Sequence, residues 1–99
     1  MLRVLVVDDD QALRLAVRTA LENAQRFSVD EAFDGVNALE KIASADTAKR
    51  AYDIVILDVD MPRKNGLETL KAIKEHDPGI IVIMLTAHAT VDIAVQAVK

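Results

Sequence analysis

Short aliphatic runs, separated by longer amphipathic segments, constrain the fold of this chain more than any other feature. Leu2–Val7, Ile54–Leu57 and Ile80–Leu85 are almost wholly aliphatic, which is typical of strands buried on both faces of a parallel sheet. Residues 27–32 alternate apolar and polar side chains and predict a shorter strand. The repeated strand–helix order predicts an α/β domain, a doubly wound parallel sheet with right-handed crossovers.

Amphipathic segments follow each of these strands. Apolar positions recur with helical period over 11–24, 36–45 and 67–75, and again from Val91 to Val98. Asp10 is the expected N-cap of the first helix. The inward-facing side chains expected on the first three helices are Leu13, Ala16, Val17, Ala20, Leu21, Leu39, Ile42, Ala43, Leu67, Leu70 and Ile73.

Composition excludes several classes of function. The 99 residues make one domain, and 28% of them are charged, so no apolar run approaches the roughly 18 residues of a membrane span. Met1 leads straight into the first strand, so we expect no signal peptide and a cytoplasmic protein. The absence of cysteine excludes a disulfide framework, a thiolate zinc site and a thiol nucleophile. A net charge of −4 offers no basic surface for nucleic acid.

Polar side chains stand at the ends of three of the strands. Asp8 and Asp9 follow the first strand, Asp58 and Asp60 follow the third, and Thr86 follows the fourth. In a flavodoxin-like sheet with strand order 2-1-3-4, the first and third strands are neighbours. Ligands of such sheets bind beyond the carboxyl ends of the strands, so we expect these carboxylates to converge there.

Converging carboxylates repel each other, and a hard divalent cation relieves that repulsion. Magnesium suits carboxylate and carbonyl oxygens, whereas His76 and His88 have no second nitrogen ligand at a useful spacing. A carboxylate beside magnesium can attack phosphorus and form an acyl phosphate, while the metal neutralises charge on the transferred group. The residues therefore suggest a magnesium-dependent aspartyl-phosphate site. The alternative is that these acids are caps and turn residues, a role expected for Asp10.

Four stretches of the sequence form a recognisable set of motifs: VLVVDDD at 4–10, YDIVILDVDMP at 52–62, NGLE at 65–68 and IMLTA at 83–87. By these motifs and their spacing, the chain resembles the receiver domain of two-component response regulators from end to end. The run at 86–92 most resembles receivers of the nitrogen-regulation type of transcriptional activator. The resemblance implies a switch that takes a phosphoryl group from a phosphohistidine on a sensor histidine kinase. The switch would then control an output domain or a downstream protein.

The resemblance also implies a role for each site residue. Asp58 would be the phosphoacceptor, and Asp8 and Asp9 would position Mg2+ together with it. Asp60 would contribute its backbone carbonyl to the metal, and Thr86 would be the switch hydroxyl that moves toward the phosphoryl group. Such a protein phosphorylates itself and has at most weak autophosphatase activity, so we expect a switch rather than an enzyme.

One departure from the family pattern concerns the C-terminal side. Receivers carry a phosphoryl-binding lysine after a fifth strand, and Lys99 falls in the expected fourth helix, one strand too early. We therefore expect residues 1–99 to be a receiver domain that lacks its fifth strand and helix. Ile80–Leu85 would then be an exposed apolar sheet edge, which favours association. The prediction is a marginal monomer that dimerises, exchanges elements or aggregates.

Two other functions compete with this one. A receiver-like interaction module without phosphotransfer would explain the missing lysine. Asp58-Val59-Asp60 after an apolar strand also matches the start of the haloacid-dehalogenase-type phosphatase pattern, with Asp58 as nucleophile, Asp60 as general acid and Thr86 on the phosphate. The order of motifs argues against a phosphatase, because the acidic pair opens this chain, whereas in that superfamily it comes late.

Overall fold

The computed structural model of the chain describes residues 1–58 and 66–85. Strands and helices alternate there in the predicted order. They are β1 (Leu2–Val7), α1 (Gln11–Asn23), β2 (Phe27–Ala32), α2 (Gly35–Thr47), β3 (Ile54–Asp58), α3 (Gly66–His76) and β4 (Ile81–Leu85). The helix expected from Val91 to Val98 lies outside the described residues, as do Asp60 and Thr86.

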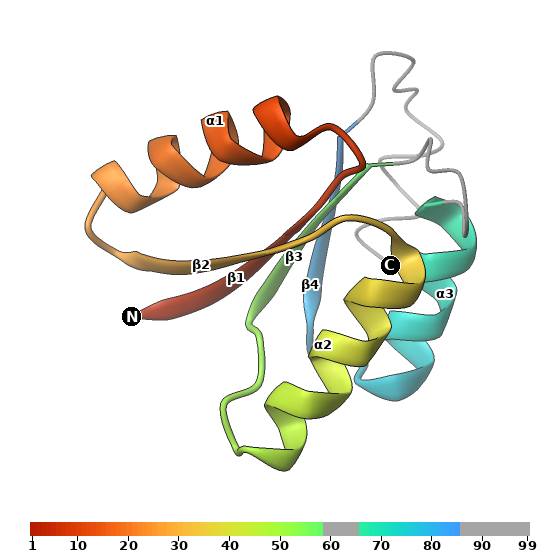
Figure 1. Cartoon of the computed structure of the whole chain (residues 1–99). Coiled ribbons are helices and arrows are strands. Elements are labelled where there is room, and N and C mark those ends of the chain that lie inside the picture. Colours follow the sequence, from red (N-terminus) through yellow and green to blue (C-terminus); the bar gives the residue numbers. More distant parts are fainter. Residues whose placement is uncertain (59–65, 86–99) are drawn as a thin grey trace.

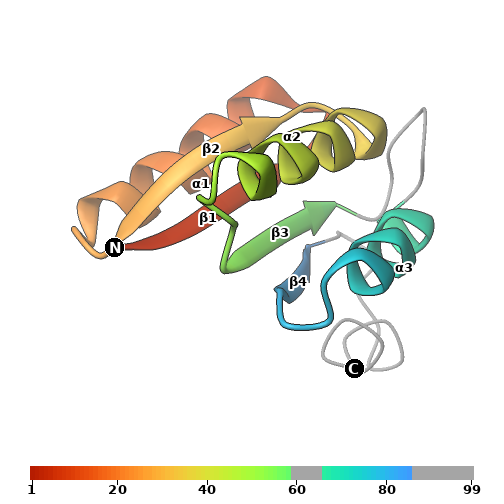
Figure 2. The ribbon, with the colours of Figure 1, turned by 90° about the horizontal axis from the view of Figure 1, so that it is seen from below.

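The strands form one parallel sheet in the order β2-β1-β3-β4, which confirms the predicted flavodoxin-like order. Helix α1 covers one face of the sheet, and α2 and α3 lie on the opposite face (Figure 1). Figure 2 shows the same layers from below, with the sheet between α1 and the other two helices. Because all pairings are parallel, the carboxyl ends of the strands lie along one edge of the sheet.

Side chains alternate along each strand and so divide the aliphatic residues between two cores. The core under α1 contains Val4, Val6 and Val29, with Val17 and Leu21 of the helix packed against it. The larger core faces α2 and α3, and its members include Leu5, Val7, Ile42, Val55, Leu57, Ile73 and Val82. Residues Val4–Val7 of β1 are therefore buried on both faces of the sheet, as the almost wholly aliphatic run predicts.

Helix α1 faces the sheet with only part of the predicted stripe, since Val17 and Leu21 pack against the core as expected. Its half-buried residues recur at helical spacing and are Arg14, Val17, Arg18 and Leu21. The expectation that Leu13, Ala16 and Ala20 face inward is wrong, since all three are exposed. Two arginines lie on the inner face in their place, and the guanidinium groups of Arg14 and Arg18 both pair with Glu31 of β2.

The other two helices differ from the prediction by smaller amounts. Helix α2 begins at Gly35, and the Asp34 side chain caps it by accepting a hydrogen bond of 2.7 Å from the Asn37 N–H. Ala43 of α2 is exposed. Leu67 of α3 is also exposed. The buried face of α3 begins one residue earlier, and its members are Gly66, Thr69, Leu70 and Ile73.

Strand β4 stands at one edge of the described sheet and is buried on one face only. Its Val82 packs into the larger core, whereas Ile81, Ile83 and Leu85 point to the side of α1 and are 58%, 45% and 39% exposed. They are exposed because α1 packs against β1 and β2, at the other side of the sheet (Figure 1). No helix within the described residues is long and apolar enough to cross a membrane.

Candidate phosphoacceptor and metal site

Strand register brings the acidic residues of two segments together at the carboxyl edge of the sheet. Val7 of β1 is paired with Leu57 of β3 in parallel register. Asp8 and Asp58 are the next residues along these two chain segments, so their side chains start from adjacent positions. The prediction that strands β1 and β3 are neighbours, on which the convergence of these carboxylates depends, is confirmed.

Three carboxylates converge there. One ligand oxygen from each of Asp8, Asp9 and Asp58 can be chosen so that all lie within 4.8 Å of one another. Asp8 is buried, Asp58 is half-buried and Asp9 is exposed. The cluster is therefore accessible to solvent on one side. A site that exchanges ligands with solvent or with a partner protein needs such an opening.

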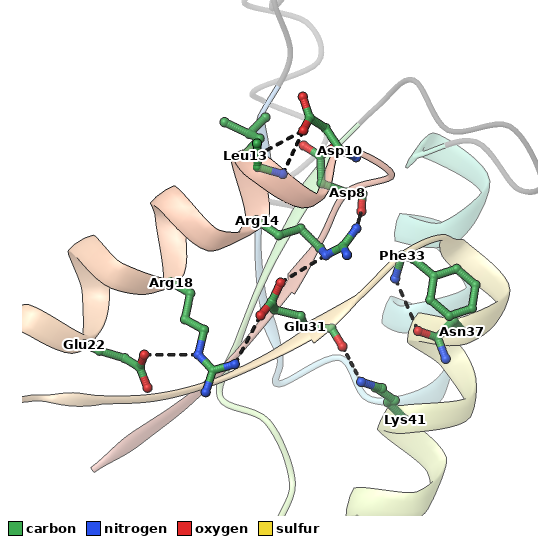
Figure 3. Close-up of polar contacts among 11 residues, drawn as sticks. Asp8, Asp10, Leu13, Arg14, Arg18, Glu22, Glu31, Phe33, Asn37 and Lys41 are labelled. Atoms are coloured by element: carbon green, nitrogen blue, oxygen red, sulfur yellow. Dashed lines mark hydrogen bonds and ion pairs between the residues drawn. The ribbon is translucent and has the colours of Figure 1, made fainter.

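The turn between β1 and α1 holds Asp8 in place. Its N–H donates to the carbonyl of Ala32 at 3.1 Å, which continues the pairing of β1 with β2. Its Oδ1 accepts a hydrogen bond of 2.9 Å from the N–H of Asp10. Asp10 in turn caps α1, since its Oδ1 accepts from the N–H groups of Ala12 and Leu13 (Figure 3). The expected N-cap is confirmed, and it also sets the geometry of the acidic turn.

Burial is the main cause that raises the pKa of the Asp8 carboxyl above its ordinary value, because the charged form loses hydration. The hydrogen bond from the N–H of Asp10 lowers this pKa, whereas the negative charges of Asp58 and Asp9 raise it. Burial and the neighbouring negative charges therefore both disfavour the ionised form of Asp8. A cation among the three carboxylates would remove that repulsion.

The donor set fits magnesium. All three possible ligands are carboxylate oxygens, which are the hard donors that Mg2+ and Ca2+ prefer. His76 is not near this cluster, because its ring faces Asp46 and joins α3 to α2 instead. The described part of the site therefore offers no nitrogen or sulfur donor for a softer metal. Asp60 and Thr86, the other two predicted site residues, lie outside the described residues.

Arg14, which the sequence did not identify as a site residue, contacts the backbone of Asp8. Its Nη1 donates to the backbone carbonyl of Asp8 at 2.6 Å, and its Nε pairs with Oε1 of Glu31 at 3.1 Å (Figure 3). A signal was available in the spacing, since position 14 shares a helical face with Val17 and Leu21. A charged residue that shares a face with apolar, sheet-facing residues needs a partner for its charge, which is a reason to examine it.

Comparison with known proteins gives the family. The sequence model of the response regulator receiver domain matches residues 4–99. The chain belongs to the response regulator receiver domain family. It is also 38% identical over 96 residues to the transcriptional regulatory protein ZraR of Klebsiella oxytoca, an alignment that covers 97% of this chain and 20% of ZraR. The chain thus spans about a fifth of that relative.

Solved receiver structures have the same fold. The response regulator protein TrrA of Thermotoga maritima, in complex with Mg2+-BeF, is similar with a TM-score of 0.82 and 32% identity, over 100% of this chain and 83% of TrrA. The receiver domain of NtrX from Brucella abortus is similar with a TM-score of 0.77 and 33% identity, over 95% and 75% of the two chains. The second structure fits the expected resemblance to receivers of the nitrogen-regulation type.

Proposed function

We propose that this chain is a phosphorylation-dependent switch in which Asp58 accepts a phosphoryl group from a phosphohistidine on a sensor histidine kinase. One observation carries the proposal. In a chain of the receiver family, Asp58 at the end of β3 and Asp8 and Asp9 after β1 offer oxygens within 4.8 Å of one another. The cluster lies at the carboxyl edge of a parallel sheet, and folds of this kind bind their ligands at that edge.

Asp8, Asp9 and Asp58 would together hold Mg2+, with the backbone carbonyl of Asp60 as a further ligand inferred from the family. When bound, magnesium supplies positive charge that offsets the charge of the transferred phosphoryl group. The three carboxylates fit this role because they are hard oxygen donors that repel one another without a cation.

The residues of the chain itself would act in the transfer as follows. A carboxylate oxygen of Asp58 attacks phosphorus, the bond between phosphorus and the histidine nitrogen breaks, and the histidine of the kinase leaves with the electron pair. The half-buried position of Asp58 at the strand end presents its carboxylate from a rigid element. Thr86 remains the predicted switch hydroxyl. The product is an acyl phosphate on the protein, so the chain is a switch and not an enzyme acting on other substrates.

The partners and the setting follow from the same proposal. Residues 4–99 match the receiver family, and we propose that this receiver works in the cytoplasm with a sensor histidine kinase. The relative ZraR is a transcriptional regulatory protein, and the chain spans 20% of it. We expect an output domain or a downstream protein, with regulation of transcription as its task, and no direct binding of nucleic acid by the receiver.

We further propose that the chain pairs with a second copy, or exchanges elements with it, through β4. Ile81 and Ile83 are 58% and 45% exposed on β4, which carries no charge and lies at an edge of the sheet formed by the described strands. Unprotected apolar edges of this kind favour pairing with another strand. Sedimentation at rising concentration should show a dimer, and Ile83→Lys should restore the monomer. A wild-type chain that stays monomeric and cooperatively folded would contradict this association.

Intact mass measurement tests the phosphoacceptor. The protein is incubated with Mg2+ and a small phosphodonor such as an acyl phosphate. The wild type should gain one phosphoryl group, Asp58→Asn should gain none, and Asp10→Asn, which removes a neighbouring acid, should behave as the wild type. An increment that persists in Asp58→Asn would place the chemistry elsewhere. No increment in the wild type would favour an interaction module that has lost phosphotransfer.

A further inference from the structure

A chain of ion pairs runs from the surface of α1 to the turn that carries Asp8. Arg18 pairs with Glu22 at 3.0 Å and with Oε2 of Glu31 at 3.1 Å, and the other oxygen of Glu31 holds Nε of Arg14 (Figure 3). The two arginines therefore share one carboxylate. The contact that distinguishes them is the hydrogen bond of 2.6 Å from Nη1 of Arg14 to the carbonyl oxygen of Asp8.

Arg14 differs from an arginine in an ordinary surface ion pair. Its side chain is only 14% exposed, against 40% for Arg18, so its charge is largely removed from water. A buried guanidinium needs partners for its donors, and Glu31 and the carbonyl of Asp8 provide them. The Glu31 carboxylate fixes the plane of the guanidinium, because a bond at Nε limits how the group can turn. The pKa of Glu31 is lowered by its bond to Arg18 and further by Arg14, so it stays ionised at neutral pH.

The bond from Arg14 completes the hold on Asp8. The N–H of Asp8 donates to Ala32, its carboxylate accepts from Asp10, and its carbonyl accepts from Arg14. The peptide groups on both sides of this residue are thus fixed by different elements. A carboxylate whose backbone is fixed in advance does not have to be ordered when it takes a cation, and groups that orient metal ligands affect affinity strongly.

We propose that Arg14, oriented by Glu31, is a positioning residue that holds Asp8 for divalent-cation binding through the backbone of Asp8. This inference rests on the proposed magnesium site and adds to it a residue that lies outside the carboxylate cluster. Arg14 acts on the cation through Asp8, whose backbone carbonyl accepts its hydrogen bond.

Arg18 provides the matched control. Arg14→Met and Arg18→Met each remove one guanidinium from the same helix and one ion pair from Glu31, but only Arg14 touches Asp8. Mg2+ affinity is measured by titration of the full 15N-labelled chain, followed through backbone amide shifts. Thermal midpoints of the metal-free proteins are recorded beside it.

The expected result is a separation of the two readouts. Arg14→Met should weaken Mg2+ binding roughly tenfold, the lower end of what loss of an orienting partner costs. Arg18→Met should leave the affinity within about twofold, because its change touches no ligand residue. Both variants should lower the metal-free thermal midpoint. Arg14→Lys, which keeps a charged donor, should lose less affinity than Arg14→Met.

Equal Mg2+ affinities for Arg14→Met and the wild type would overturn the inference, and so would equal losses in Arg14→Met and Arg18→Met. If Arg14→Met does not fold, Arg14→Lys against Arg18→Lys replaces the pair and the same comparison decides. A wild-type chain that shows no Mg2+ binding would instead remove the proposed metal site itself, so the two failures are distinguishable.

Discussion

Asparagine in place of Asp58 should stabilise the metal-free protein while removing most of its response to magnesium. The three site carboxylates lie within 4.8 Å of one another, and Asp8 already has a raised pKa that reflects burial and the charges of Asp58 and Asp9. Removing one of these charges relieves the repulsion. Asparagine has nearly the same shape as aspartate and keeps a carbonyl acceptor, so packing at the end of β3 is preserved.

The size of the effect follows from Coulomb's law. At 4.8 Å two unit charges repel by about 3.5 kcal/mol at an effective dielectric constant near 20 and by about 0.9 kcal/mol in bulk water. Asp9 is exposed and Asp58 is half-buried, so solvent and salt screen much of this and leave a relief of about 1–2 kcal/mol. For a domain of this size, about 1 kcal/mol raises the thermal midpoint by about 4–8 °C.

Thermal unfolding with and without magnesium is the assay. Metal-free Asp58→Asn should unfold at least about 4 °C above the wild type. Magnesium at about 100 times its dissociation constant should stabilise the wild type by about 2.7 kcal/mol and the variant much less. Asp10→Asn is the control, because it removes an adjacent acid but keeps a residue that caps α1 equally well.

Either of two results would refute this reasoning. A lower metal-free midpoint for Asp58→Asn would mean that the carboxylates do not repel each other in the folded protein. An equal gain from magnesium in the wild type and in Asp58→Asn would mean that the cation binds elsewhere.

Three further predictions concern the fold. Burial and a hydrogen bond of 2.7 Å to Asp30 raise the pKa of Tyr52 from 10.0 to about 12. Because the unfolded chain ionises first, stability should fall as pH rises from 10 toward 12, and the phenolate absorbance of this single tyrosine should titrate late. Ile73→Val in the core should lower the free energy of unfolding in urea by about 0.5–1.5 kcal/mol. Leu15→Ala, at a side chain that is 58% exposed, should change it by less than about 0.5 kcal/mol. Similar losses in the two variants would contradict the assigned burial. Asp10→Ala should cost about 0.5–2 kcal/mol by removing the cap of α1, with Asp10→Asn near the wild type.

The strands could be predicted closely because aliphatic runs, and in residues 27–32 the alternation of apolar and polar side chains, admit few alternatives. Leu2–Val7 and Phe27–Ala32 are strands with the predicted bounds, and the sheet order follows once all pairings are parallel. Helix faces were harder to predict. The apolar period of α1 favoured Leu13 on the inner face, but Arg14 and Arg18 lie on that face and pair with Glu31 of a distant strand, while Leu13 is exposed.

The candidate site divides in the same way. Asp8, Asp9 and Asp58 lie at or just after strand ends, so the strand pattern together with the expected 2-1-3-4 order is enough to predict that they converge. Arg14 contributes through a backbone carbonyl and a partner 17 residues away, and no local pattern contains that pairing. Contacts of this kind, between residues far apart in the sequence or through a backbone carbonyl, can be found only once the three-dimensional fold is known.

The most direct test of the central claim is to locate the phosphoryl group by chemical trapping. Borohydride reduces an aspartyl phosphate to homoserine, and peptide mass mapping then identifies the converted residue. After incubation with a small phosphodonor, the account predicts homoserine at position 58 with Mg2+ and none when the metal is chelated. Homoserine at another position, or conversion at position 58 that does not depend on Mg2+, would contradict it.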